Sequence, residues 1–164
     1  MRFLYYDSVT HLEKGKSIIG VKTFSLSEEF LRGHYKKVAR VPAVIMIEAM
    51  AQLLGWLIIF SHDFRLSPIM SLLEEVTVTP HLRPGFKAEI HGEMVSSSKR
   101  DSLGKARMYV DGKEIASVDR MIYSHIYTDH REDLIQLFRY YSGLDRIDPP
   151  VALSRPGGDT SKSL

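Results

Sequence analysis

Residues 41–60 (VPAVIMIEAMAQLLGWLIIF) form an almost unbroken apolar run, and this run constrains the fold more than any other feature of the chain. Its length is close to the roughly 20 residues that span a bilayer, so a membrane helix is one interpretation. Glu48 and Gln52 lie near its middle, where an acidic side chain costs roughly 3 kcal/mol on insertion scales. We therefore favour a helix that is apolar on nearly every side because the rest of a folded domain surrounds it.

Segments with the patterns of β-strands lie on both sides of this run. Five of them have β-branched or alternating residues: 17–25, 69–79, 86–94, 105–110 and 113–126. Asp111 and Gly112 separate the last two, and Asp-Gly is a strong signal for a tight hairpin. One early helix followed by a run of antiparallel strands predicts an α+β fold in which a curved sheet wraps the helix.

The chain changes character after residue 127. Asp129 and Glu132 have the spacing of a capping box, apolar residues follow at helical spacing, and Gly143 is suited to end a helix. The rest of the chain is rich in Pro, Gly and Ser. We expect a folded domain over residues 1–127, a C-terminal helix over 128–143 and a flexible tail over 144–164.

Composition excludes several classes of function. The 164 residues include no cysteine, which excludes a disulfide scaffold, a thiol nucleophile and a zinc site built on thiolates. The chain has 22 Lys and Arg residues against 20 Asp and Glu, a net charge of +2 that gives little support to nucleic-acid binding. No pair of histidines has zinc-ligand spacing and no glycine-rich phosphate loop is present, so we expect neither a metal nor a cofactor. No signal-peptide pattern is seen, and the expected location is the cytoplasm.

Two residues are candidates for acid–base chemistry. Glu48 and Gln52 are four residues apart, so both lie on one side of the expected helix. An apolar environment disfavours the charged form of a carboxyl group, which would let Glu48 hold and donate a proton. His34 follows Gly33 shortly before the helix, and histidine is a frequent general base. From these residues alone, a structural carboxyl group that reaches solvent or bonds loop backbone explains Glu48 equally well.

Two stretches of the chain resemble the signature of a known family: Gly33-His34 with Pro42-Ala43-Val44, and Glu48-Ala49-Met50-Ala51-Gln52. The family is the 3-hydroxyacyl-acyl-carrier-protein dehydratases of type II fatty acid synthesis. Its members have Gly-His-Phe-Pro-Gly-x-Pro-x-x-Pro-Gly-Val and then Glu-Ala-x-Ala-Gln, with the same interval from His to Glu. Weaker similarity over 3–9, 22–30 and 78–85 extends the resemblance to roughly residues 3–126.

The resemblance implies the hotdog fold, a long helix wrapped by a curved antiparallel sheet, paired into homodimers that can assemble as a trimer of dimers. It implies a hydro-lyase that converts 3-hydroxyacyl thioesters on acyl carrier protein into trans-2-enoyl thioesters, in fatty acid or related lipid or polyketide synthesis, without a cofactor. His34 would remove the α-proton, and Glu48 of the other subunit would protonate the departing hydroxyl. A glutamate rather than the aspartate of the related dehydratase-isomerases favours simple dehydration.

Further residues are expected to serve this chemistry. The backbone N–H groups of Ala43 and Val44, at the positive end of the helix dipole, would hold the oxyanion of the thioester, and Gln52 would orient the Glu48 carboxyl group. An acyl tunnel is expected to be lined by Met46, Met50 and Phe86. A basic cluster that would dock the acidic carrier protein comprises Lys36, Lys37 and Arg40.

The chain also departs from the family pattern. Tyr35-Lys36-Lys37-Val38-Ala39 stands in place of Phe-Pro-Gly-x-Pro, and Ala43 stands in place of a glycine. Two other functions therefore stay open: an acyl thioesterase on the same fold, and a non-catalytic protein that binds acyl groups or the carrier protein.

Overall fold

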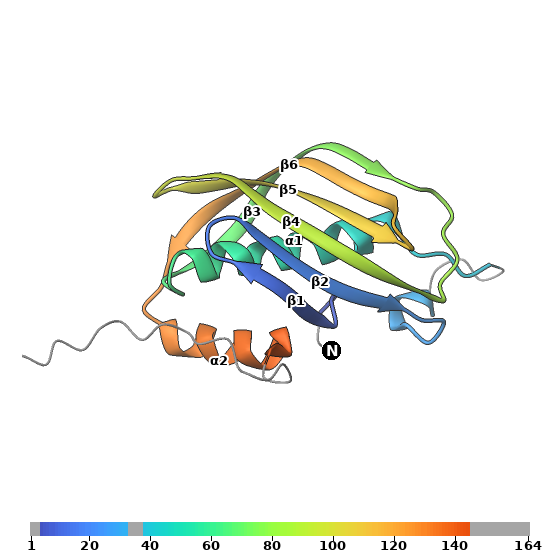
Figure 1. The fold of residues 1–164 in the computed structure, drawn as a ribbon, viewed down its shortest axis with the longest axis horizontal. Helices are drawn as coiled ribbons and strands as arrows, with labels where there is room; N and C mark the ends of the chain where they lie inside the picture. The colour runs from blue at the N-terminus through green and yellow to red at the C-terminus, as the bar shows by residue number, and fades with distance from the viewer. Residues whose placement is uncertain (1–3, 33–37, 145–164) are drawn as a thin grey trace, which may run out of the picture.

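The computed structural model describes residues 4–32 and 38–144. These residues form one antiparallel six-stranded sheet, in the order β1-β2-β4-β5-β6-β3, that curves around the helix α1 (Ala43–Ser61) (Figure 1). The strands are β1 (Ser8–Glu13), β2 (Ser17–Phe24), β3 (Leu66–Val78), β4 (Phe86–Ser97), β5 (Asp101–Val110) and β6 (Lys113–Tyr127). A short 3₁₀ helix, Glu29–Leu31, precedes α1. This arrangement is the hotdog fold, which confirms the fold expected from the sequence.

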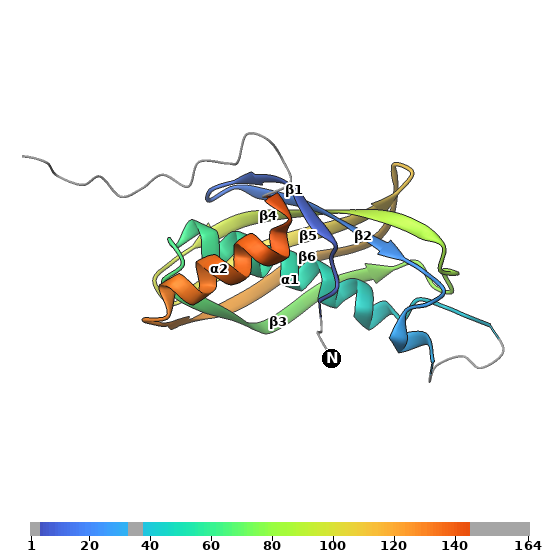
Figure 2. The same ribbon diagram turned by 90° about the horizontal axis from the view of Figure 1, so that it is seen from below.

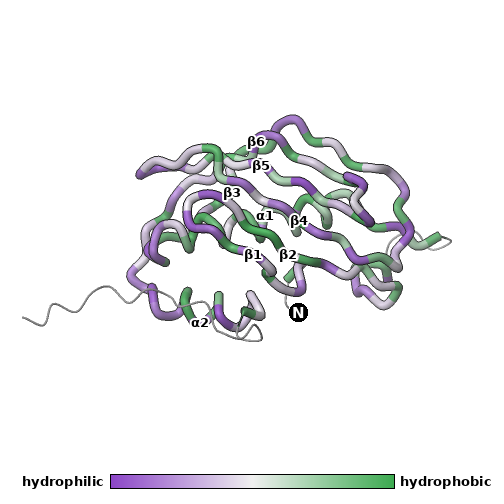
Figure 3. The backbone as a smooth tube through the Cα atoms, in the orientation of Figure 1, coloured by the Kyte–Doolittle hydropathy of each residue, from purple (hydrophilic) through white to green (hydrophobic). Residues whose placement is uncertain are grey.

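The apolar run is the core helix of the domain. Ten residues of α1 are buried: Met46, Ala49, Met50, Ala51, Leu53, Leu54, Gly55, Leu57, Ile58 and Ile59. Among the described helices, α1 alone is long and apolar enough to cross a membrane, yet 56% of that stretch is buried inside the domain. Figure 3 shows the contrast between the hydrophobic α1 and the mixed colours of the strands and of the second helix. Burial against the sheet therefore accounts for the apolar run.

All five predicted strands are confirmed, and the structure adds one strand that was not predicted. At the tip of the β5–β6 hairpin Asp111 and Gly112 have positive φ values of 51° and 77°, as a tight two-residue turn requires. The sequence analysis predicted no strand where β1 lies. The pairing of β1 with β2 shifts between Val9 and His11, so the alternation that marks a strand is interrupted there.

The C-terminal helix α2 (Arg131–Ser142) starts later than predicted. The expected capping box of Asp129 and Glu132 is wrong: His130 is the N-cap residue, and no side chain of the described residues caps it. Gly143 ends the helix, as predicted, with a left-handed φ of 67°. Beyond Leu144, the expected tail lies outside the described residues.

Side chains of α1 pack directly against the backbone of the sheet where three strands carry a glycine. These are Gly20 on β2, Gly92 on β4 and Gly104 on β5. A Cβ atom on Gly104 would lie 2.5 Å from a methyl carbon of Leu54 and 2.9 Å from the carbonyl oxygen of Glu93. The missing side chains thus set the distance between helix and sheet.

A polar cluster joins the C-terminal end of α1 to the sheet. His62 Nε2 is hydrogen-bonded to Ser97 Oγ (2.8 Å), Ser97 Oγ to Ser102 Oγ (2.8 Å), and Ser102 Oγ to His125 Nε2 (2.9 Å). The two imidazole rings close this chain at a centroid distance of 4.8 Å. Burial and the neighbouring His125 ring lower the pKa of His62, so this ring is held in its neutral form more strongly than in the unfolded chain.

Replacing Gly104 with alanine should lower the free energy of unfolding by about 1–3 kcal/mol, because the added methyl group must displace backbone as well as Leu54. Gly55→Ala is the matched control: a Cβ there meets only Pro68 Cγ, at 3.8 Å. In that helical position alanine should stabilise the fold by up to about 1 kcal/mol. Urea denaturation measures both changes, and an unaltered Gly104→Ala variant would contradict the close approach.

Stability should also decrease in weak acid through His62. The pKa of His62 is lowered below 6.5, mainly by burial. The nearby His125 and Lys14 lower this pKa further, whereas the negative charge of Asp63 raises it. His62 therefore binds a proton more readily in the unfolded chain than in the folded one. The contribution of neutral His62 to the free energy of unfolding is complete above pH about 6.5 and is lost as the pH falls below that value. His62→Gln should flatten the dependence of the unfolding free energy on pH between about 7.5 and 5.5. His11→Gln, at an exposed position, should leave it as steep as in the wild type.

Candidate active site

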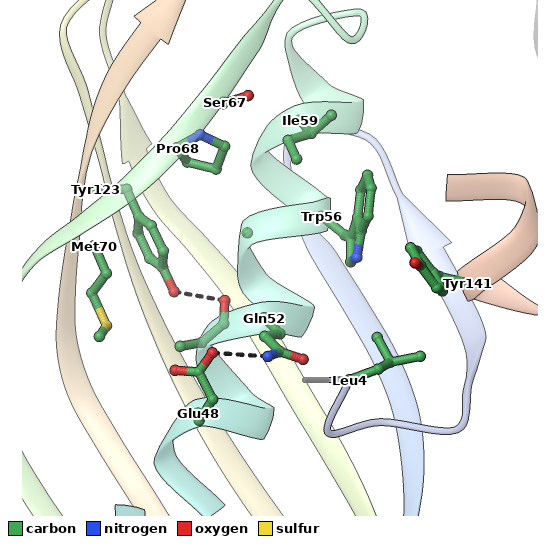
Figure 4. Close-up of a pocket in the computed structure, with 12 residues that line it drawn as sticks. Leu4, Glu48, Gln52, Trp56, Ile59, Ser67, Pro68, Met70, Tyr123 and Tyr141 are labelled. Atoms are coloured by element: carbon green, nitrogen blue, oxygen red, sulfur yellow. Dashed lines mark hydrogen bonds between the residues drawn. The ribbon is translucent and has the colours of Figure 1, made fainter. Parts of the chain in front are cut away.

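A cavity of about 600 Å³ lies along α1 (Figure 4), and its size is within the range of small-molecule sites. Successive turns of α1 form the floor of the cavity, with the residues Glu48, Ala51, Gln52, Gly55, Trp56 and Ile59. Pro68 and Met70 of β3 and Tyr123 of β6 form one wall. Leu4, which precedes β1, and Tyr141, which belongs to α2, lie on the opposite side of the cavity. The cavity therefore combines one carboxyl group with a mainly apolar and aromatic lining.

Gln52 is hydrogen-bonded both to the carboxyl group of Glu48 and to the backbone of Tyr5. Its Nε2 donates a hydrogen bond to Glu48 Oε1 over 2.8 Å, and its Oε1 accepts one from the backbone N–H of Tyr5 over 3.0 Å. The backbone N–H can only donate, so it fixes which end of the amide faces the carboxyl group. The Glu48 side chain lines the cavity (Figure 4). Because its Oε1 atom is bonded to Gln52, its second carboxyl oxygen is the one left to face the cavity.

Tyr123 ties the sheet to α1 beside Glu48. Its hydroxyl donates a hydrogen bond to the carbonyl oxygen of Ala51 over 2.9 Å, and the side chain is only 3% exposed. Burial raises the pKa of the Tyr123 hydroxyl above its ordinary value, and the charge of Glu48 acts in the same direction. The hydroxyl therefore stays protonated at neutral pH and remains a hydrogen-bond donor.

The N-terminal end of α1 presents two backbone N–H groups that have no acceptor among the described residues. Pro42 is the N-cap residue, and its carbonyl oxygen accepts a 3.0 Å bond from the N–H of Ile45. The N–H groups of Ala43 and Val44 come first in the helix and have no acceptor within it. Both residues are exposed, Val44 at 67%. These are the donors that the sequence analysis assigned to the oxyanion.

The segment before α1 is anchored to the loop between β3 and β4. The Arg40 guanidinium donates to Nδ1 of His81 over 2.7 Å, and the N–H of Val41 donates to the carbonyl oxygen of Leu82 over 2.9 Å. Arg40 is thus held at the entrance to the helix. His34, Lys36 and Lys37 lie outside the described residues, so their positions relative to Glu48 stay predictions.

The structure places the predicted tunnel residues between helix and sheet. Met46 and Met50 are 1% and 0% exposed. Phe86 packs on Phe24 with ring centroids 5.1 Å apart. These three side chains are not part of the lining of the Glu48 cavity in the described residues, and a tunnel past them stays a prediction.

The sequence analysis missed several residues that line the cavity. Trp56 follows Glu48 and Gln52 at intervals of four, so its position on the same face of α1 was open to prediction. Pro68, Tyr123 and Tyr141 come from elements far away in the chain, and no local pattern places them beside Glu48. Within the described residues no cluster of three or more His, Asp or Glu side chains is arranged to hold a metal ion.

Comparisons with known proteins agree with this architecture. Residues 1–119 match the family model of the FabA-like domain. The 3-hydroxyacyl-acyl-carrier-protein dehydratase FabZ of Caldicellulosiruptor saccharolyticus is 30% identical over 114 residues, which are 69% of this chain and 81% of that protein.

Two solved structures show the same fold at low identity. The dehydratase heterocomplex ApeI:P from Xenorhabdus doucetiae has a TM-score of 0.59 and 15% identity, over 83% of this chain and 90% of that one. A thioesterase from Haemophilus influenzae has a TM-score of 0.58 and 7% identity, over 74% and 80%. At these identities the likeness concerns the fold alone. The family model spans residues 1–119, which is well over half of the chain and includes α1, so the chain belongs to the FabA-like family.

Proposed function

We propose that this protein is a dehydratase that converts 3-hydroxyacyl thioesters on acyl carrier protein into trans-2-enoyl thioesters in fatty acid synthesis. The observation that carries the proposal is Glu48: a carboxyl group on the core helix, oriented by Gln52 and facing a cavity. Membership of the FabA-like family and the similarity to a FabZ dehydratase support the same activity.

The reaction assigns one proton transfer to each of two residues. His34, assigned by its family motif, takes the α-proton of the thioester, and the C–H electron pair moves onto the thioester oxygen to give an enolate. This electron pair then returns to form the double bond between the α- and β-carbons as the 3-hydroxyl group leaves. Glu48 gives its proton to the 3-hydroxyl group, and the C–O bond breaks to release water. The products are the trans-2-enoyl thioester and one water molecule, and proton exchange with solvent restores both residues.

The N-terminus of α1 suits the charge that develops on the thioester oxygen. Removal of the α-proton places negative charge on that oxygen, and preorganised N–H donors lower the barrier to this step. Ala43 and Val44 present such donors at the positive end of a 19-residue helix. The methyl group of Ala43 leaves its N–H group in place, so the chain keeps this function where the family has glycine.

We further propose that the active unit is a homodimer, with a trimer of dimers as the larger assembly, in which His34 and Glu48 of one site come from different subunits. An edge strand of the sheet supports this. The strand β3 lies at the edge, and Ile69, Leu72 and Val76 on it are 52%, 39% and 41% exposed. An apolar edge of this kind favours pairing with a second chain.

His34→Ala and Glu48→Gln should each lower kcat/KM for dehydration by about a hundredfold or more, the usual contribution of a general acid or base. Formation of the enoyl product from a 3-hydroxyacyl carrier protein, followed by absorbance and mass spectrometry, measures this loss. His11→Ala and Glu132→Gln, at exposed positions away from the cavity, are matched controls that should keep wild-type rates.

Mixing the two inactive variants tests the shared site. Mixed dimers contain one site with both His34 and Glu48, so part of the activity should return. Dehydration that survives both single substitutions would show that the site is elsewhere. Release of free thiol without enoyl product would identify a thioesterase instead, and carrier binding without either product would identify a non-catalytic binding protein.

The basic cluster of Lys36, Lys37 and Arg40 is proposed to dock the acidic carrier protein. Replacing Lys36 and Lys37 with glutamate should raise KM several-fold for the carrier-bound substrate and leave KM for the coenzyme A thioester unchanged. Lys99→Glu with Lys113→Glu, at exposed positions, is the matched control. An equal effect on both substrates would refute docking at this cluster.

A further inference from the structure

The helix α2 lies beyond residues 1–119, which match the family model, yet it contributes a side chain to the Glu48 cavity. Tyr141 faces the cavity from α2, beside Trp56 of α1 (Figure 4). The second view of the fold shows α2 packed along the outer side of α1 (Figure 2). An element that the family region lacks therefore shapes the candidate site.

The position of α2 is fixed by aromatic packing against the C-terminal half of α1. Phe138 is 2% exposed, and its ring lies 5.3 Å from Trp56, 5.6 Å from Phe64 and 6.0 Å from Phe60, centroid to centroid. Tyr141 follows Phe138 by three residues, so both project from the same side of α2. Tyr141 is therefore held in place as a wall by a packed helix.

The floor of the cavity has no side chain at Gly55. A Cβ there would make a single ordinary van der Waals contact, with Pro68 Cγ at 3.8 Å, so a larger side chain at this position would extend into the cavity. From Glu48 the floor continues over Ala51 and Gly55 to Ile59, a distance of ~17 Å at the rise of an α-helix. The lining beyond Glu48 and Gln52 is mainly apolar and aromatic, which suits a hydrocarbon chain.

We propose that the acyl chain of the substrate extends from Glu48 over Gly55 toward Ile59, and that Tyr141 of α2 together with Gly55 determines the acyl-chain length that the site accepts. This inference rests on the proposed dehydratase function. The thioester lies near Glu48, the methyl end lies between Pro68 and the Trp56–Tyr141 wall, and α2 narrows the far part of the site.

Two substitutions should shift chain-length preference in opposite directions. With 3-hydroxybutyryl, 3-hydroxyoctanoyl and 3-hydroxydodecanoyl thioesters, Gly55→Leu should lower kcat/KM for the longest relative to the shortest chain by about tenfold or more. Gly55→Ala should lower the same ratio by a smaller factor, because its methyl group fills less of the cavity. Tyr141→Ala should raise the same ratio. Leu137→Ala is the matched control on α2, because Leu137 is 42% exposed and is absent from the cavity lining. Equal losses for all chain lengths would overturn the proposal.

Tryptophan fluorescence gives a readout that does not require catalysis. Trp56 is the only tryptophan of the chain and it lines the cavity. Dodecanoyl-coenzyme A, which has no 3-hydroxyl group to lose, should change its emission in the wild type, and butyryl-coenzyme A should change it much less. Gly55→Leu should remove the dodecanoyl response.

The two assays separate the inference from the proposed function. A wild type that forms no enoyl product but shows the dodecanoyl response, lost in Gly55→Leu, would contradict the dehydratase activity and support the chain-binding site. An active dehydratase whose Trp56 emission is the same with and without dodecanoyl-coenzyme A would overturn the chain-binding site and leave the activity intact.

Discussion

The direct contact of α1 with the backbone of the sheet is the constraint on which the rest of the structure depends. Leu53 and Leu54 lie over the glycines of β2, β4 and β5, where a Cβ atom would come within 2.5–3.0 Å of its nearest neighbour. This contact decides which face of α1 turns inward. The residues on its other side, Glu48, Gln52 and Trp56, then line the cavity. A carboxyl group thus sits on the most buried helix of the domain without lying in its core.

The sequence predicted the parts that follow from local pattern. The apolar run at residues 41–60 and the Asp111-Gly112 hairpin predicted a core helix and a strand pair, and both are confirmed. The family motif singled out Glu48 and Gln52, whose hydrogen bond the structure shows. The strand β1 was missed because a register shift interrupts its alternation.

The remaining parts of the site depend on contacts between distant segments. Tyr123 reaches Ala51 only because β6 pairs with β3 in a register that no short stretch of sequence specifies. Tyr141 reaches the cavity only through the packing of Phe138 on α1. Periodicity in α2 predicted a helix but carried no information about the surface on which it packs. Tertiary contact of this kind is the reason that the walls of the site could not be predicted.

The hydrogen bond from Tyr5 to Gln52 places an unusual demand on the chain. It is made by a backbone N–H, which every residue except proline supplies, so the identity of the side chain at position 5 is irrelevant to it. Proline there would remove the N–H donor, and with it the bond that distinguishes the oxygen of the Gln52 amide from its nitrogen. The orientation of the proposed acid thus depends on a backbone group at a position where any residue except proline can supply it. A comparison of side chains among relatives would not detect this dependence.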